Sequence, residues 1–398
     1  MPRFEPFGAV HYATGTDLAV VTAPPYDVLS DDEVAALTAR DPHNVVIIDV
    51  PLDRDGPGRY EQAGAAFRQW QHDGVLVSDP SSAFYRYTMV FADESGRAHT
   101  TVGVFGGLTV VDGPDGGVLP HEQTTPKAKT DRLDLTRATE ANLSAVWGLS
   151  LATGLTASIT AAAAVELGSF VDEDGVGHRL ERIEEPDAVA VIATLVSSAP
   201  VVIADGHHRY AVARTYRDER KVASGGEPGP FDLTLAFVIE LAEDQLFVQA
   251  IHRLLTDVPD GYELTGALAS SFDLTPAGLV TADIVPALQR EAALCLVDPD
   301  GMGTFLHPRS HVPMGGRDLD SVRLEHALAA VPHTKSYQHG VDRVVAAVRD
   351  GRAQHGVLLR PVPLAEIQRT AHEHLLMPPK STFFAPKPKT GLLFRMVR

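Results

Sequence analysis

Short apolar runs rich in β-branched residues alternate along this chain with amphipathic helical patterns, and glycine or proline separates them. Strands are predicted where such runs are bounded by turn residues, at residues 44–52, 83–91, 99–110, 201–205, 233–241 and 292–298. Helices are predicted over residues 31–40, 59–74 and 187–198, and again directly after Gly206. This alternation predicts an α/β fold of the mixed α+β kind.

Turn and capping residues refine these boundaries. Ser30 followed by Glu33 forms a capping box for the first long helix. Residues 93–96 (Asp-Glu-Ser-Gly) favour a hairpin between the second and third predicted strands, so the first part of the chain is expected to be mixed rather than purely parallel. Residues 153–167 are rich in alanine and predict a helix, and residues 172–183 predict a hairpin or short strand pair.

The chain has 398 residues, enough for two or three domains and a substantial core. With 44% hydrophobic and 22% charged residues, its composition is that of an ordinary soluble globular protein. We expect an N-terminal part over residues 1–150, a central part over 151–260 and a C-terminal part over 261–398. The three parts are expected to form one compact two-lobed unit.

Charge and cysteine content narrow the function classes. A net charge of −18 disfavours direct binding to nucleic acid or to an anionic membrane, so an anionic ligand needs a local basic cluster. The single cysteine, Cys295, excludes an intramolecular disulfide and lies in an apolar run, where a buried thiol is expected. The first residues do not resemble a signal peptide, and no apolar run approaches membrane-spanning length, so a cytoplasmic location is expected.

The most informative segment is Val201–Ala213, in which an apolar strand breaks at Asp205 and Gly206 and a helix begins with His207, His208 and Arg209. A strand–turn–helix junction presents backbone N–H groups and the positive end of a helix beside cationic side chains, which suits phosphate. Glycine permits close approach of a ligand and a positive φ. The alternative is structural, with Asp205 as an N-cap and the histidines as partly buried helix residues.

A second polar segment covers residues 121–147. Lys127, Lys129 and Arg132 form a local cationic cluster, and Glu122 and Asp131 supply carboxylates for a metal or for proton transfer. The alternative is a solvated charged loop that leads into a helix capped by Thr130 or Asp131.

Two further segments contain candidate residues. At residues 24–29, two prolines stiffen the chain and present Tyr26 and Asp27, although a structural turn explains this segment as well. The C-terminal segment, residues 377–391, is predicted to be an extended, ordered tail that brings Lys380, Ser381 and Lys387 over a site, or that simply packs along the surface.

These four segments, in this order, resemble the prokaryotic domain-of-unknown-function family 1015 over nearly the whole chain. The matching motifs are PPYDV near the start, HE-T-K-DR in the middle, ADGHHRY-A, and PPKST-F-PKP-GL at the end. In the middle motif Ala128 separates Lys127 from Lys129, and either lysine fits the family position. The family resemblance implies no activity.

The ADGHHRYAVA segment is also similar to the Gly-x-His-Arg helix start of the ParB and sulfiredoxin superfamily, which includes a nucleotide-dependent kinase acting on free serine. This resemblance covers about 20 residues. It implies a ParB/sulfiredoxin-like core around residues 185–255, elaborated by N- and C-terminal lobes. It also implies that Gly206, His208 and Arg209 line nucleotide phosphates.

The leading hypothesis is therefore a nucleotide-dependent, Mg²⁺-assisted phosphotransferase that acts on a small hydroxylated metabolite such as serine, with ATP or another phosphate donor. Phosphoryl transfer needs charge neutralisation, in-line positioning and an acceptor for the hydroxyl proton. The predicted phosphate-binding residues are Gly206, His207, His208, Arg209, Lys127, Lys129 and Arg132.

The predicted catalytic residues are Asp205, Glu122 and His208, and the first two are also the predicted metal ligands. One alternative class is a nucleotide-gated binding or regulatory protein without kinase activity. A hydrolase with a metal held by His207, His208 and carboxylates ranks last, because adjacent histidines on one helical turn point in different directions.

Overall fold

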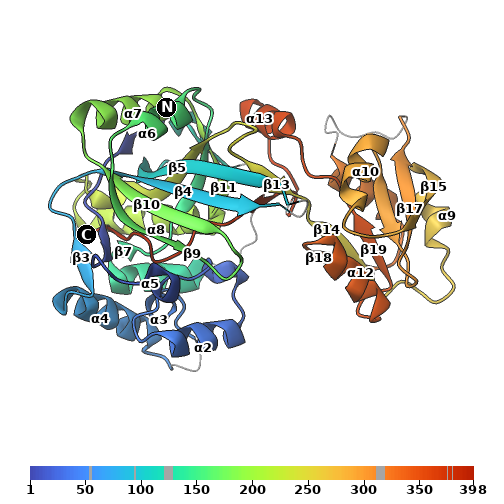
Figure 1. Cartoon of the computed structure of the whole chain (residues 1–398), viewed down its shortest axis with the longest axis horizontal. Helices are drawn as coiled ribbons and strands as arrows, with labels where there is room; N and C mark the ends of the chain where they lie inside the picture. Colours follow the sequence, from blue (N-terminus) through green and yellow to red (C-terminus); the bar gives the residue numbers. More distant parts are fainter. Residues whose placement is uncertain (53–55, 94–95, 121–128, 311–318, 374, 379) are drawn as a thin grey trace. The chain divides into compact units, whose positions relative to one another are not determined.

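The chain forms two compact units in a computed structural model that describes residues 1–52, 56–93, 96–120, 129–310, 319–373, 375–378 and 380–398. The larger unit contains Met1–Phe247, Gln368–Leu375 and Pro386–Arg398, and the smaller unit contains Val248–Ile367 and Leu376–Ala385. The last segment of the chain therefore returns to the larger unit (Figure 1). The three-part division at residues 150 and 260 stays a prediction about domain boundaries.

A mixed sheet organises the larger unit. Its strands lie in the order β6 (Val118–Pro120), β11 (Val201–Asp205), β8 (Val146–Ser150), β12 (Leu233–Glu240), β5 (Ala98–Thr109), β4 (Phe84–Ala92), β10 (Gly177–Ile183) and β9 (Val165–Val171), with β1 (Phe4–Glu5) beside β5. Strand β11 pairs in parallel with β6 and antiparallel with β8, and β8 pairs in parallel with β12. The remaining pairs are antiparallel.

Helices cover this sheet. Figure 1 shows α6 (Leu155–Ala161) and α7 (Pro186–Ser198) along one side of it and α2 (Asp31–Arg40), α3 (Val46–Asp49), α4 (Arg59–His72) and α5 (Lys129–Thr139) along the other. The long helix α8 (His207–Ala223) follows β11 directly and packs against α5, β8 and β12. The described part of this unit also contains α1 (Leu18–Val21) and the short pairs β2 (Val10–Tyr12) with β3 (Leu76–Ser78) and β7 (Ala141–Asn142) with β21 (Arg395–Met396).

Among the described residues, two large apolar cores hold the larger unit together. One lies between the sheet and helices α6 and α7, where residues such as Ile159, Ile192 and Ile203 are almost fully buried. The other joins helices α1 to α5 and includes Phe67 and Phe394, whose rings meet edge to face at 5.4 Å. Because Phe394 belongs to the last segment of the chain, this core also fixes the C-terminal tail.

The smaller unit has its own sheet and core. The strand order is β15 (Phe272–Leu279), β17 (Met302–Pro308), β16 (Leu294–Val297), β19 (His355–Leu358), β14 (His252–Thr256) and β18 (Thr334–Gln338). Its helices include α9 (Leu264–Leu268), α10 (Ile284–Glu291), α11 (Asp320–Leu328) and α12 (Val341–Arg349). Cys295 is buried in this core, as predicted, and burial raises the pKa of its thiol to about 12.

Two predictions of local structure are wrong. The apolar run at residues 44–52 forms the short helix α3, because the Asn44 side chain accepts a hydrogen bond from Val46 N at 3.1 Å and starts a helical turn. Val46 and Ile48 are then buried in the helical core, and this packing outweighs their β-propensity. The helix predicted over residues 153–167 ends at Ala161, and strand β9 begins at Val165.

Other local predictions are confirmed. The capping box is present, with Glu33 N donating to Ser30 Oγ and Ser30 N donating to the Glu33 carboxylate. Strands β4 and β5 pair antiparallel on either side of Asp93 and Gly96. Residues 172–183 contain a turn and strand β10, but the partner strand β9 lies before them, in the segment predicted as a helix. The fold class is mixed α/β, as the alternating pattern predicts. The ParB-like character of the core stays a prediction.

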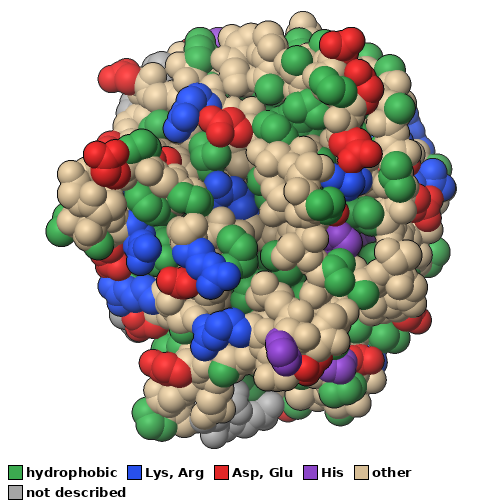
Figure 2. All heavy atoms as spheres, turned by 90° about the vertical axis from the view of Figure 1, so that its left-hand side faces the viewer, with side chains coloured by type: hydrophobic (Ala, Val, Ile, Leu, Met, Phe, Trp, Pro, Cys, Tyr) green, Lys and Arg blue, Asp and Glu red, His purple; other side chains and the backbone are tan. Residues whose placement is uncertain are grey.

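Surface features add two observations. Across the described ranges, no helix is both long enough and apolar enough to cross a membrane. On the face shown in Figure 2, basic side chains lie among acidic ones rather than in a continuous stripe of one sign. On this face, a cationic site for an anion would be a local cluster rather than a broad basic surface.

Candidate functional site

The junction between β11 and α8 has the predicted strand–turn–helix form. Residues 201–204 are buried in the sheet, and the pairing of β11 with β8 shifts register between Ile203 and Asp205, which re-aims the end of the strand. Gly206 has φ 87°, a left-handed conformation that glycine adopts without strain. A Cβ atom there would lie 3.0 Å from Arg209 Nε and 3.2 Å from Val146 Cα. Both the conformation and the close packing thus require glycine.

The first turn of α8 has no side-chain cap, because its N-cap residue is Gly206. The basic residues His207, His208 and Arg209 occupy this first turn, and no acidic residue does. The partial positive charge of a helix N-terminus is therefore reinforced rather than neutralised by its own first turn. Such an end favours an anion.

Asp205 ties together two cations from different segments. One of its oxygens accepts a hydrogen bond from Arg209 Nη2, and the other lies 2.8 Å from Lys387 Nζ. Lys387 comes from the C-terminal tail and also lies 3.2 Å from the carboxylate of Asp27, in the short helix Tyr26–Val28. The Lys387 side chain is only 13% exposed, so these two carboxylates are its main compensation.

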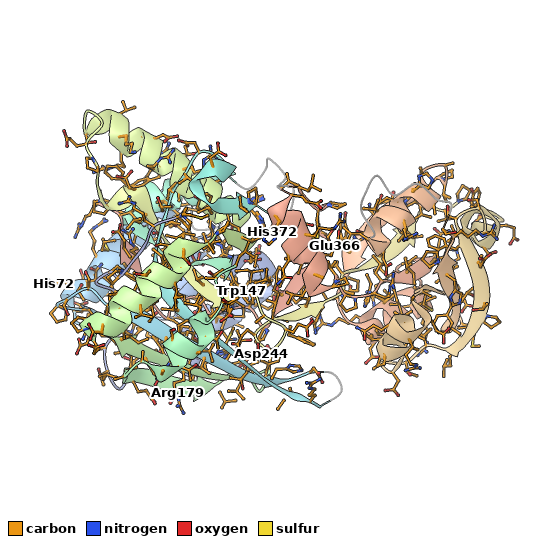
Figure 3. The ribbon with its side chains drawn as sticks, turned by 90° about the horizontal axis from the view of Figure 1, so that it is seen from above. His72, Trp147, Arg179, Asp244, Glu366 and His372 are labelled. Carbon is orange, nitrogen blue, oxygen red and sulfur yellow. The ribbon has the colours of Figure 1, made fainter. Side chains whose placement is uncertain are left out.

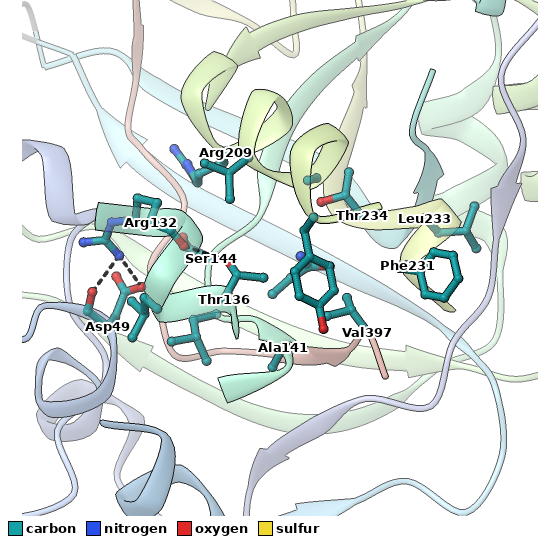
Figure 4. Close-up of a pocket in the computed structure, with 16 residues that line it drawn as sticks. Asp49, Arg132, Thr136, Ala141, Ser144, Arg209, Phe231, Leu233, Thr234 and Val397 are labelled. Carbon is teal, nitrogen blue, oxygen red and sulfur yellow. Dashed lines mark hydrogen bonds and ion pairs between the residues drawn. The ribbon is translucent and has the colours of Figure 1, made fainter. Parts of the chain in front are cut away.

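A second ion pair lies beside the first. Arg132 Nη1, on α5, donates to the backbone oxygen of Asp49 at 2.6 Å and to its carboxylate at 3.0 Å (Figure 4). The guanidinium of Arg132 stacks over the Tyr26 ring at 3.5 Å, and that of Arg209 lies 5.9 Å from the same ring. Arg209 Nη1 also donates to the Ala145 carbonyl oxygen. Tyr26 thus lies near two arginines that come from separate segments of the sequence.

The electrostatics of the cluster keep Asp205 and Lys387 charged at neutral pH. Burial alone would raise the pKa of Asp205, but Arg209 and Lys387 outweigh it and hold this pKa at about 2. Burial would lower the pKa of Lys387, but Asp205 and Asp27 raise it. Burial raises the pKa of Asp49, although Arg132 and Arg209 oppose this.

Two small cavities border Arg209. The larger, about 40 Å³, is lined by Arg132, Asn142, Ser144 and apolar residues of α5 and α8 (Figure 4). The smaller, about 10 Å³, is lined by Trp147, Asp205 and the tail residues Pro388, Lys389 and Thr390. Trp147, labelled in Figure 3, lies on β8 within the sheet. Each of the two cavities holds a few water molecules at most. Neither cavity could admit a nucleotide unless side chains of the cluster moved apart.

Of the predicted site residues, the structure brings Asp205, Gly206, Arg209 and Arg132 together. His207 and His208 lie in the first turn of α8. Glu122 and Lys127, and the side chain of Lys129, lie outside what the structure describes.

The third and fourth segments also divide. Tyr26 and Asp27 reach the cluster, and so does Lys387, whereas Lys380 and Ser381 belong to the smaller unit. Asp49 is not among the predicted site residues, because the sequence pattern predicts a strand for the run that contains it. Its signal in the sequence is a single carboxylate at the end of four consecutive apolar residues.

The predicted Mg²⁺ ligands are Asp205 and Glu122. Both oxygens of Asp205 contact cationic side chains. Among the described residues, no group of three or more His, Cys, Asp or Glu is arranged to hold a metal ion. Of the two predicted Mg²⁺ ligands, the described residues therefore include only Asp205, and Arg209 and Lys387 already compensate the charge of its carboxylate.

Fold and site together define a mixed α/β protein with a buried ionic cluster at the start of a helix that follows a central strand. Residues 4–329 match the family described as "Protein of unknown function (DUF1015)", and the chain belongs to this family. No curated protein matches the chain.

Several solved structures are similar to parts of the chain. A free serine kinase in complex with AMP is 12% identical, over 73% of this chain and 91% of that chain, with a TM-score of 0.37. A conserved hypothetical protein from Pyrococcus furiosus is 11% identical over 73% and 95%, with a TM-score of 0.36. SbnI from Staphylococcus aureus, truncated at its C-terminus, is 12% identical over 72% and 85%, with a TM-score of 0.38. Superpositions this loose carry no inference about this chain.

Proposed function

We propose that the protein is a nucleotide-dependent phosphotransferase that acts on a small hydroxylated metabolite, with donor phosphates bound at the start of α8. The observation that carries this proposal is the convergence of Arg209 and Lys387 on Asp205 beside a helix N-terminus that has no side-chain cap. Helix N-termini and arginine forks are the donors that bind phosphate oxygens most effectively.

Phosphate binding uses cations that already compensate carboxylates in the free protein. An incoming phosphate replaces Asp27 as a partner of Lys387. The Asp27 side chain is 40% exposed, and its distance of 3.2 Å from Lys387 Nζ is longer than the 2.8 Å that separates Lys387 Nζ from Asp205. Arg209 keeps its contact with Asp205 and offers to the ligand the guanidinium N–H groups that bond neither Asp205 nor the Ala145 carbonyl oxygen. Arg132, whose guanidinium stacks over the Tyr26 ring, adds further positive charge. His207, His208 and either Lys127 or Lys129 remain proposed phosphate ligands.

In the proposed reaction the bond between the donor's terminal phosphorus and its bridging oxygen breaks. A bond forms from the acceptor's hydroxyl oxygen to that phosphorus, and the hydroxyl proton passes to a carboxylate or imidazole and then to solvent. Asp205 is the proposed acceptor of this proton, with His208 or Glu122 as alternatives. The low pKa of Asp205 makes it a weak base. Loose phosphoryl-transfer transition states demand little from a base, so orientation of the hydroxyl is its main task.

Mg²⁺ would add positive charge to the donor phosphates, and it stays a proposal that rests on Asp205 and Glu122. Arg209 and Lys387 act on the phosphoryl oxygens directly, where charge spreads as the donor bond breaks.

A second function, nucleotide binding that switches the protein without phosphate transfer to a metabolite, is favoured by one observation. Both oxygens of Asp205 are engaged by cationic side chains, which suits a role in holding Arg209 and Lys387 rather than in accepting a proton. This function predicts the same ligand at the same place.

Product analysis separates these functions. The purified protein is incubated with ATP, ADP, CTP or pyrophosphate, with Mg²⁺ and a panel of hydroxylated metabolites that includes serine, and products are identified by mass spectrometry. A new phosphorylated metabolite supports the phosphotransferase. Nucleotide binding with no phosphorylated metabolite supports the switch, and absence of binding to any donor contradicts both.

A further inference from the structure

Behind the site lies a closed ring of buried polar groups that begins and ends on one tail residue, Lys389. Its backbone N–H donates to Tyr87 Oη at 3.4 Å, and its side-chain Nζ lies 2.7 Å from Asp172 Oδ2. Between these two ends, Tyr87 Oη lies 2.7 Å from His178 Nδ1, and His178 Nε2 lies 3.0 Å from the same Asp172 oxygen.

The chemistry of the ring fixes its hydrogen-bond directions. The Asp172 carboxylate accepts, so His178 Nε2 carries the proton and donates, and Nδ1 accepts from the Tyr87 hydroxyl. That hydroxyl in turn accepts the Lys389 N–H. Asp172 Oδ1 is engaged separately by the backbone N–H groups of Asp174 and Val176, which hold the turn between β9 and β10. Each group of the ring therefore has a defined role as hydrogen-bond donor or acceptor.

Burial makes this geometry costly to change. The Tyr87 side chain is fully buried, and those of His178 and Asp172 are 1% and 9% exposed. The ring of His178 is nearly parallel to that of Tyr87, with centroids 5.9 Å apart, and its centroid lies 4.6 Å from that of the Phe170 ring. Burial lowers the pKa of His178 in spite of Asp172, so the neutral tautomer that the ring needs is favoured. For Asp172, burial opposes ionisation, but bonds from Lys389 and His178 still lower its pKa.

The tail connects this ring to the site over a very short distance. Lys387 is two residues before Lys389, and the residue between them is Pro388, whose ring fixes its own φ. On the other side, Thr390 pairs with Ala23 through two backbone hydrogen bonds of 2.8 Å and 3.1 Å. Holding Lys389 thus restricts the backbone from which Lys387 reaches Asp205.

We propose that Tyr87, His178 and Asp172 are positioning residues that hold Lys389 and thereby place Lys387 against Asp205 for the anionic ligand. This inference rests on the proposed phosphate site. A lysine has a long, flexible side chain that loses conformational entropy when it binds a ligand. Ligand affinity is higher when the lysine backbone is already fixed, because less entropy is then lost on binding. None of the three ring side chains is assigned a contact with the ligand itself.

Strand β4 offers a matched control. Tyr85 lies two residues before Tyr87, is equally buried, and its hydroxyl contacts Asp79, the Phe7 carbonyl oxygen and Ala9 N. Its partners do not include the tail residues 386–390. Tyr85→Phe and Tyr87→Phe therefore remove the same hydroxyl from the same strand, and only Tyr87→Phe opens the ring.

The test measures hydrogen–deuterium exchange of the tail peptide in the free protein and ATP affinity by calorimetry. Tyr87→Phe is expected to raise exchange at Lys389 and to weaken ATP binding about threefold to tenfold, whereas Tyr85→Phe changes neither. In a Lys387→Met background, Tyr87→Phe is expected to have no further effect on affinity. Lys389→Met should reproduce Tyr87→Phe, and Lys389→Arg, which keeps a cation on Asp172, should restore most of the affinity.

Unchanged tail exchange in Tyr87→Phe overturns the ring, whatever the ligand. An affinity loss of equal size with and without Lys387 overturns the positioning role and leaves Tyr87 a merely structural residue. If the wild-type protein binds none of ATP, ADP, CTP and pyrophosphate, the proposed function fails. Exchange then still decides the ring: raised exchange in Tyr87→Phe but not in Tyr85→Phe supports it.

Discussion

Helices α7 and α8 lie close together in sequence, yet their first turns are built in opposite ways. At α7, the Glu185 side chain accepts hydrogen bonds from Asp187 N at 3.2 Å and Ala188 N at 2.7 Å, and Pro186 needs no acceptor. At α8, Gly206 has no side chain with which to cap the helix. The first helix satisfies its own N-terminus, and the second leaves this role to groups outside the helix.

Charge follows the same contrast. The first turn of α7 contains an acid, whereas that of α8 contains three basic residues, which the helix dipole disfavours by about 0.3–1 kcal/mol for each charged one. The last turn of α8 contains Arg220 and Lys221, where the dipole favours cations. A local rule is therefore kept at one end of the helix and broken at the other. Such departures are expected at functional sites.

Removal of Arg209 is the largest expected effect. Arg209→Ala should weaken ATP binding about tenfold to a hundredfold, because a charge-assisted contact contributes about 1.5–3 kcal/mol. It should also lower the thermal midpoint, since Asp205 and the Ala145 carbonyl oxygen lose a buried partner. Calorimetry and thermal unfolding measure both. Arg214→Ala on the same helix, whose pairing with Asp112 is exposed, is the control and should leave ATP affinity unchanged.

Asp205→Asn separates binding from chemistry. The amide keeps the shape of the side chain but leaves Arg209 and Lys387 with less compensation, so ATP affinity should be equal or tighter. Turnover should fall about a hundredfold if the carboxylate orients or deprotonates the acceptor. Steady-state product formation measures this. Full turnover in Asp205→Asn would move the catalytic assignment to Glu122 or His208.

Stability should show a pH signature of Asp205. Its pKa in the folded protein lies near 2, below its ordinary value, so its ionisation stabilises the fold above about pH 4. That contribution is lost as the pH falls from about 4 to about 2. Urea unfolding of wild type and Asp205→Asn at pH 6, 4 and 2.5 should give a free-energy gap that shrinks across this window. A constant gap would mean that Asp205 is not held by Arg209 and Lys387.

The capped helix gives the smallest expected effect on the site. Glu185→Ala removes the α7 cap and should cost about 1 kcal/mol of stability. ATP affinity should not change, because no described contact joins Glu185 to the ionic cluster. Weaker ATP binding in this variant, measured by calorimetry beside the wild type, would contradict the view that only the start of α8 contributes to the ligand site.

Local signals in the sequence predicted much of this architecture. Gly206 after an apolar strand marked the junction, Ser30 and Glu33 marked a helix start, and Gly96 marked a hairpin. These features depend on a few neighbouring residues, so local reasoning is sufficient for them. The strand predicted at residues 44–52 was wrong, because burial of Val46 and Ile48 in a helical core depends on distant residues such as Phe67.

The site was harder to predict because its members come from five segments. Asp205 and Arg209 are four residues apart and were predicted together, whereas Lys387 lies 182 residues from Asp205. The contacts of Lys389 with Tyr87 and Asp172 depend on how the tail crosses the sheet, which no pattern within the tail reveals. Charged residues between prolines were the one visible signal.

The most direct test of the central claim is a crystal structure of the full chain with ADP or pyrophosphate. The account predicts phosphate oxygens within hydrogen-bond distance of the first-turn N–H groups of α8, with Arg209 and Lys387 as charged partners. Phosphate bound at another place, with Lys387 still seated between Asp27 and Asp205, would contradict it.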